Sequence, residues 1–112
     1  MQIATRAVGD VQILDCSGQI TLGEGTRTVR DAVVNLLEKG NKKIVLNLAG
    51  VSYIDSAGVG ELVSTYASVS NRGGQLKLLH LTKRIRELLT LTKLLTVFQV
   101  FEEEKDAVAS FK

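Results

Sequence analysis

The stretch YIDSAGVGEL, residues 53 to 62, places an acidic residue, a serine and two glycines between an apolar run and a helical pattern. A serine at such a junction can cap a helix, attack a substrate or carry a removable charge. Asp55 and Ser56 are both good helix N-caps, and one of them must help to satisfy the free N–H groups of the helix that follows. Most serines at such positions act only as caps, so a further role for Ser56 has to come from its neighbours.

Catalysis and nucleotide binding are poorly supported by these residues. A nucleophile elbow needs glycine two residues before and two residues after the serine, and Ile54 occupies the first of these positions although Gly58 satisfies the second. The only histidine, His80, lies in an apolar strand pattern, which favours a structural imidazole over a catalytic base. GVGELV lacks the third glycine of the dinucleotide fingerprint, LGEGTRT lacks the P-loop lysine, and no Cys/His cluster has metal-ligand spacing. We therefore expect no enzyme activity, cofactor or metal.

The two glycines favour a protein-binding role instead. Gly58 and Gly60 fall in the first turns of the expected helix, where each costs about 0.5–1 kcal/mol relative to alanine. Small residues there leave the backbone open to a close approach, as needed where another protein lays a phosphate donor against Ser56. We predict Ser56 as the phosphate acceptor, Asp55 as a cap and acidic neighbour, and Ala57, Gly58 and Gly60 as contact surface.

Composition restricts the class of protein and its partners. The chain has 112 residues, 45% of them hydrophobic, so residues 1–112 are expected to form a single domain with one modest core. A net charge of +2 and 4% aromatic residues provide neither the basic patch nor the stacking surface typical of nucleic-acid binding. The lone Cys16 is interpreted as a buried thiol in a reducing compartment. Because neither a signal peptide nor a membrane-spanning run is apparent, we expect a cytoplasmic protein.

Hydrophobic periodicity predicts the elements that position Ser56. The expected strands are residues 2–8, 11–17, 43–48, 75–81 and 97–101, and the expected helices are residues 26–39, 56–71, 82–92 and 102–111. Gly9 and Asp10 suit a tight hairpin turn, whereas GQITLGEGT and AGVSYID are interpreted as linking segments. The strand and helix order implies crossover connections. The fold class is therefore α/β or α+β, with a mixed sheet of about five strands covered by about four helices.

The segment D-S-A-G-V-G at positions 55 to 60, preceded by IVLNLAGVSYI and followed by a helix, resembles the signature of the STAS domain family, in particular the bacterial anti-sigma factor antagonists. The hairpin start, the GQI loop, the GGQLKLL strand and the later RELLTLTKLLTVFQVFEEEKDAVASF extend the resemblance to nearly the whole chain. The resemblance implies that an anti-sigma factor with serine kinase activity phosphorylates Ser56 and that a serine phosphatase reverses this. The unmodified protein would bind the anti-sigma factor and so free a sigma factor.

The chain also departs from the family pattern at two positions. Ala57 stands where the family often has Ser or Thr, which removes a second local phosphate acceptor, and Thr21 stands where an acidic residue often follows the Gly-x-apolar step. STAS domains also act in stress-signalling assemblies and as partners of transporters. The alternative function is therefore a subunit that docks permanently on a transporter ATPase without phosphorylation.

Overall fold

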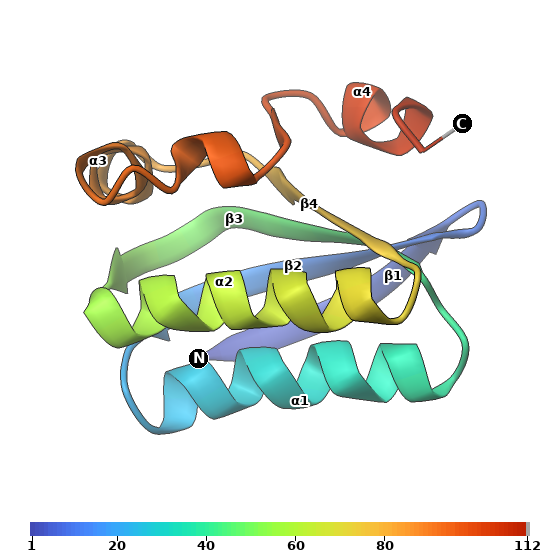
Figure 1. The fold of residues 1–112 in the computed structure, drawn as a ribbon, viewed down its shortest axis with the longest axis horizontal. Helices are drawn as coiled ribbons and strands as arrows, with labels where there is room; N and C mark the ends of the chain where they lie inside the picture. The colour runs from blue at the N-terminus through green and yellow to red at the C-terminus, as the bar shows by residue number, and fades with distance from the viewer. Residues whose placement is uncertain (112) are drawn as a thin grey trace.

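Five strands form one mixed sheet in the computed structural model, which describes residues 1–111 (Figure 1). They are β1 (Gln2–Val8), β2 (Val11–Ile20), β3 (Lys43–Ile54), β4 (Gln75–Leu79) and β5 (Val100–Phe101). Their order in the sheet is β1-β2-β3-β4-β5, with β1 antiparallel to β2 and the other neighbours parallel. The predicted hairpin and mixed sheet are confirmed.

Four α-helices connect or follow these strands within the described residues 1–111. They are α1 (Glu24–Glu38), α2 (Ser56–Asn71), α3 (Lys83–Leu91) and α4 (Glu104–Ala109), and a short 3-10 turn, η1, spans Leu95–Val97. None of these helices is long and apolar enough to cross a membrane. All four predicted helices are confirmed; α2 has the predicted bounds, and the others differ by a few residues at their ends.

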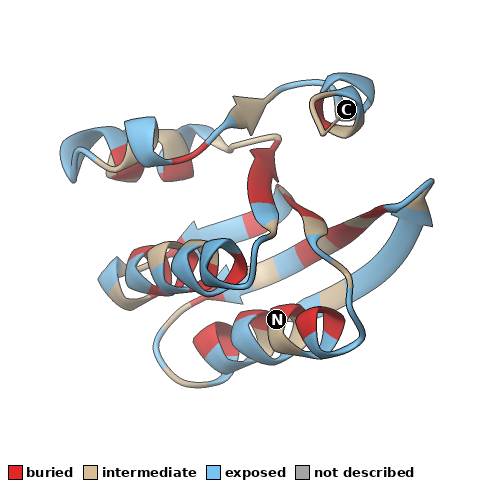
Figure 2. Ribbon diagram, turned by 45° about the vertical axis from the view of Figure 1, so that its right-hand side comes forward, coloured by how far each residue is buried: buried red, intermediate tan, exposed pale blue. Residues whose placement is uncertain are grey.

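The sheet separates two apolar clusters, because its residues alternate between its faces. The larger cluster joins residues of β2 and β3, such as Leu14 and Leu46, to residues of α1, α2 and α3. On the other face a smaller cluster lies beneath α4; its buried members are Val11, Ile13, Val45, Leu79 and Ala107. Figure 2 shows that β1 remains mostly exposed beside this layered core.

Parts of two segments that we expected to be linkers belong to strands instead: GQI extends β2 to Ile20, and AGVSYI extends β3 to Ile54. The pairing of β2 with β3 continues past Asp15 through two register shifts and ends with Ile20 opposite Ile54. The residues AGVSYI are thus the second half of β3, because the irregular pairing lets both strands run on after the apolar pattern is interrupted. This extension carries the chain directly to Asp55 at the start of α2.

The C-terminal strands are shorter than predicted. β4 ends at Leu79 because His80 takes a left-handed conformation with φ of 57°, and β5 contains two residues where five were expected. Lys77 is a charged residue within the otherwise apolar β4, and it is buried. Its Nζ donates to the Ser110 Oγ at 2.7 Å and lies 4.3 Å from the centre of the Phe111 ring. Lys77 therefore anchors the end of the chain against the sheet.

Candidate protein-binding site

Asp55, and not Ser56, caps α2. Asp55 is the extended N-cap residue, and its Oδ1 accepts a hydrogen bond from the Gly58 N–H at 2.8 Å. Ser56 is the first helical residue and is exposed, and within residues 1–111 no side-chain hydrogen bond engages its hydroxyl. The serine is therefore not required for capping, and its hydroxyl is accessible at the helix N-terminus.

The same aspartate also holds the loop between β2 and α1. Its Oδ2 accepts a hydrogen bond from the Leu22 N–H at 3.1 Å, while its own N–H donates to the Ile20 carbonyl at 3.4 Å. The Gly58 and Leu22 N–H groups lower the pKa of the Asp55 carboxyl, because both bonds favour the charged form. Asp55 thus fixes the position of the loop relative to the start of α2, a role that its sequence position did not reveal.

The two glycines of the site serve different purposes. Gly58 is buried, and a Cβ at this position would lie 2.1 Å from the Ile20 carbonyl oxygen and 2.6 Å from the Ile54 Cγ1. Gly60 is exposed, and a Cβ there would meet nothing within 4 Å. The expectation that Gly58 offers an open contact surface is therefore wrong, because its lack of a side chain lets α2 pack on the ends of β2 and β3.

Exposed apolar side chains flank Ser56. Leu22, in the loop held by Asp55, is 80% exposed, and Tyr53, near the end of β3, is 41% exposed. Gly60 follows Ser56 by four residues on α2, which places both on one side of the helix. We call Leu22, Tyr53, Ser56 and Gly60 the Ser56 surface. Sequence periodicity missed Leu22, because a single leucine in a glycine-rich loop belongs to no apolar pattern.

A positively charged side chain, Arg84, lies next to this surface. The guanidinium of Arg84, on α3, lies 5.2 Å from the centre of the Tyr53 ring, within the range of a cation–π contact. Arg84 is exposed, so its charge remains available to a binding partner. The surface thus combines apolar groups, a modifiable hydroxyl and a positive charge, a combination suited to protein recognition.

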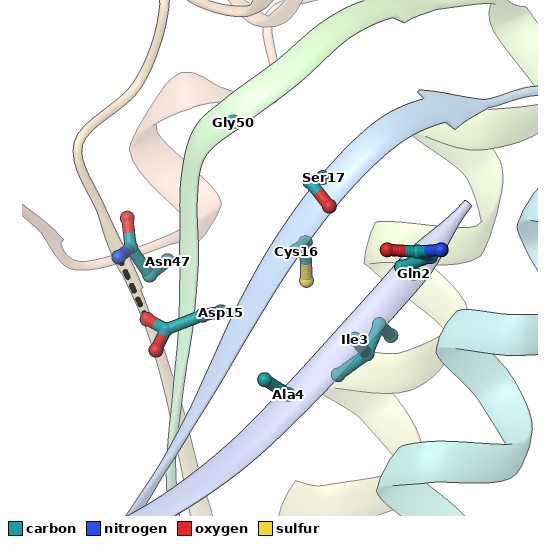
Figure 3. A pocket seen from close by; sticks show the side chains of 8 residues that line it. All are labelled: Gln2, Ile3, Ala4, Asp15, Cys16, Ser17, Asn47 and Gly50. Carbon is teal, nitrogen blue, oxygen red and sulfur yellow. Dashed lines mark hydrogen bonds between the residues drawn. The ribbon is translucent and has the colours of Figure 1, made fainter.

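Ser56 has no catalytic partner in the described part of the chain. His80 lies beyond the end of β4 and lines a hollow with Ala49, Leu81, Thr82, Arg86 and Glu102, and no hydrogen bond joins it to Ser56 within residues 1–111. A second hollow, of about 650 Å³, lies on the open face of the sheet among β1, β2 and β3 (Figure 3). Ser56 lines neither hollow, so the geometry does not support a serine nucleophile.

The fold and the serine at the start of α2 define the class of protein. The STAS domain family model matches residues 2–107, and the chain belongs to this family. The anti-sigma-B factor antagonist of Bacillus subtilis is 31% identical over 99 residues, which cover 88% of each chain. The chain is therefore similar over most of its length to an anti-sigma-B factor antagonist.

Solved structures agree with this assignment. A candidate anti-sigma factor antagonist from Thermotoga maritima superposes with a TM-score of 0.87 at 28% identity, covering 96% of this chain and 92% of that one. The phosphorylated form of the Bacillus cell fate determinant SpoIIAA superposes with a TM-score of 0.76 at 17% identity, covering 99% of this chain and 100% of that one. The second likeness concerns the fold alone.

Proposed function

We propose that this chain is an anti-sigma factor antagonist whose protein binding is switched at Ser56. In its unmodified form it binds an anti-sigma factor with serine kinase activity and so frees a sigma factor. Phosphorylation of Ser56 weakens that complex, and a serine phosphatase restores it. One observation at the start of α2 supports this proposal most directly. Asp55 makes the capping hydrogen bond, so the exposed Ser56 is not needed as a cap.

The Ser56 surface is the proposed contact with the anti-sigma factor. Leu22 supplies an exposed apolar side chain on a loop that Asp55 already holds, so little loop ordering is needed on binding. Ser56, Ala57 and Gly60 form the small-residue part of the contact, which allows the kinase active site to approach the hydroxyl. Gly58 contributes indirectly, by keeping α2 close to the sheet.

The chemistry of the switch is supplied by the partners. The kinase brings ATP and transfers its terminal phosphate to the Ser56 oxygen, while this chain provides the acceptor and the docking surface and is not itself an enzyme. The added charge of about −1.5 to −2 then meets a partner surface that was packed against a neutral hydroxyl. Because a sigma factor acts with RNA polymerase, we place this function in the cytoplasm.

Affinity capture from an extract of the source organism tests the proposal. The wild-type chain, Ser56→Ala, Ser56→Asp and the control Ser68→Asp, which adds the same charge at an exposed position later in α2, are immobilised in parallel. We expect an anti-sigma factor with a kinase domain to be retained by all except Ser56→Asp. Mass spectrometry after addition of ATP should locate phosphate on Ser56.

The alternative function predicts a different pattern in the same experiment. A transporter ATPase retained equally by wild type and Ser56→Asp, with no phosphate on Ser56, would contradict the switch and support permanent docking. Equal retention of an anti-sigma factor by Ser56→Asp would leave the partner correct but refute control by charge.

A further inference from the structure

The outer edge of β1 is an unpaired strand edge within the described residues 1–111. β1 forms one end of the sheet and pairs only with β2, from Gln2 opposite Ser17 to Val8 opposite Val11 (Figure 1). The other end of the sheet is β5, which contains only two residues and therefore offers little edge for pairing. β1 contains seven residues, a length over which another strand can be added.

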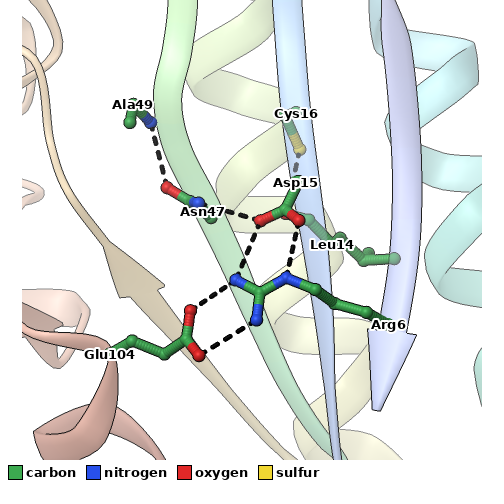
Figure 4. Close-up of polar contacts among 7 residues, drawn as sticks. All are labelled: Arg6, Leu14, Asp15, Cys16, Asn47, Ala49 and Glu104. Atoms are coloured by element: carbon green, nitrogen blue, oxygen red, sulfur yellow. Dashed lines mark hydrogen bonds and ion pairs between the residues drawn. The ribbon is translucent and has the colours of Figure 1, made fainter. Parts of the chain in front are cut away.

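This edge lacks the features that usually prevent strands from pairing. β1 contains no proline, and its register with β2 runs without a bulge. Its single charged residue is Arg6, whose Nε donates to Asp15 at 2.7 Å and whose Nη1 donates to Glu104 at 2.9 Å (Figure 4). The guanidinium is thus held by two carboxylates on the α4 side of the sheet, and it does not prevent another strand from pairing with the edge of β1.

The hairpin turn determines which backbone groups face outward. Gly9 and Asp10 form a two-residue turn, so Val8 and Val11 are a hydrogen-bonded pair. Because this pattern alternates along the strand, the even-numbered residues of β1 bond to β2, and Ile3, Thr5 and Ala7 direct their N–H and C=O groups outward. Thr5 and Ala7 are exposed and Ile3 is half-buried, so these groups are accessible.

We propose that two copies of this chain pair through β1 in antiparallel orientation, about a two-fold axis at Thr5. In this register Thr5 lies opposite Thr5 of the second copy, and Ile3 lies opposite Ala7. All three outward-facing residues of each copy then take part, which gives about six hydrogen bonds.

Side-chain size and strand length favour this register. An axis at Arg6 would bring two Arg6 side chains, each already bonded to Asp15 and Glu104, against each other, whereas an axis at Thr5 places each Arg6 opposite a small residue, Ala4. An axis at Ile3 would leave Ala7 unpaired, because the described strand begins at Gln2. The resulting assembly is one continuous sheet across both copies, and it uses no residue of the Ser56 surface.

The two-fold axis makes the proposal testable by charge exchange. Residues opposite each other in a hydrogen-bonded pair have Cα atoms about 5.5 Å apart. In a dimer of Thr5→Lys alone, or of Thr5→Glu alone, two like charges would therefore lie opposite each other at the axis. In a dimer that contains one copy of each variant, a positive and a negative charge would lie opposite each other. Thr96→Lys, at an exposed position in η1, is the matched control for the added charge.

Sedimentation equilibrium and native mass spectrometry measure the outcome. We expect the wild type and Thr96→Lys to dimerise, each Thr5 variant to raise the dimer dissociation constant at least tenfold, and an equimolar mixture to form a one-to-one heterodimer. A wild type that stays monomeric up to about millimolar concentration would overturn the proposal. So would a Thr5→Lys protein that dimerises like the wild type, or a mixture that forms no heterodimer. Circular dichroism confirms that each variant is folded.

Discussion

The contrast between Gly58 and Gly60 provides a sharp test of how the start of α2 is built. At Gly58, an added Cβ would lie 2.1 Å from the Ile20 carbonyl oxygen, whereas carbon and oxygen normally approach to about 3.3–3.6 Å. The helix and the sheet would have to separate by about 1.2–1.5 Å, because the obstructing atom belongs to the backbone and cannot rotate away. At Gly60 the same Cβ meets nothing within 4 Å.

The magnitudes predict opposite signs for the two alanine variants. Overpacking at Gly58 costs about 1–3 kcal/mol, and improved helix propensity returns about 0.5–1 kcal/mol, so Gly58→Ala should lower the unfolding free energy by about 1 kcal/mol and by at most about 2.5 kcal/mol. Gly60→Ala improves the helix propensity without creating a steric clash, so it should raise the unfolding free energy by about 0.5–1 kcal/mol. The melting temperatures should differ accordingly, by about 4 °C for each kcal/mol.

Urea unfolding followed by circular dichroism measures both variants against the wild type. Similar dependence on urea concentration in all three would show that the change lies in stability and not in the extent of unfolding. A Gly58→Ala protein as stable as the wild type would refute the close packing of α2 on Ile20. A Gly60→Ala protein destabilised by more than about 1 kcal/mol would refute the open space assigned to that position.

Three further predictions concern residues around the site and in the core. Leu22→Ala should change stability by no more than about 0.5 kcal/mol, because the side chain is 80% exposed, yet lower the affinity for the captured anti-sigma factor at least tenfold in a binding titration; an unchanged affinity would exclude Leu22 as an anchor. Burial raises the pKa of the Cys16 thiol to about 12, so a thiol reagent at about pH 8 should label Cys16 only when urea is added, and rapid labelling of the native protein would contradict its burial. Because the pKa of the Asp55 carboxyl is lower in the folded protein, its carboxylate stabilises the fold fully at pH values above its ordinary pKa of about 3.9. This stabilisation is lost as the pH falls through the lower pKa of the folded state. Urea midpoints measured from neutral pH downward should therefore fall less steeply below about pH 4 in Asp55→Asn than in the wild type, and identical profiles would count against the two bonds to Gly58 and Leu22.

The sequence predicted α2 well because its signals were local. Apolar residues at helical spacing, a polar cap before them and RGG after them specify the helix without any long-range contact. The second half of β3 carried no such signal, because Ala49 and Gly50 interrupt the apolar run and the strand continues only by pairing with the irregular end of β2. Local patterns therefore located the serine but not the strand that leads to it.

The roles of individual site residues depended on tertiary contacts. Asp55 and Ser56 are equivalent as caps in sequence terms, and the Leu22 N–H contacts Asp55 only because the ends of β2 and β3 lie together. Likewise, Gly58 and Gly60 look alike in the sequence, and only the position of Ile20 distinguishes the packed glycine from the exposed one. Residue types indicated a candidate site, whereas the separate roles of Asp55, Gly58 and Gly60 within it became clear only from the fold.

The separate roles of Asp55 and Ser56 explain how a phosphate on Ser56 could end binding without unfolding the domain. Ser56 occupies the first position of α2, where the positive end of the helix dipole favours negative charge by about 0.3–1 kcal/mol and up to about 2 kcal/mol. Asp55 opposes the phosphate by like-charge repulsion, but both groups face solvent, which screens them. Because the cap bond to Gly58 belongs to Asp55, phosphorylation removes no hydrogen bond that the fold uses.

The phosphoprotein and the unmodified protein should therefore differ in unfolding free energy by less than about 2 kcal/mol, the scale of a charge at a helix terminus. Affinity for the anti-sigma factor should fall at least tenfold, or about 1.4 kcal/mol, because the interface must desolvate the new charge or repel it. Urea unfolding of both forms, measured beside a binding titration, separates the two effects. A phosphoprotein destabilised by much more than the helix-terminus scale would mean that the switch acts through the fold of α2, since a local charge acting only at the interface leaves the helix in place.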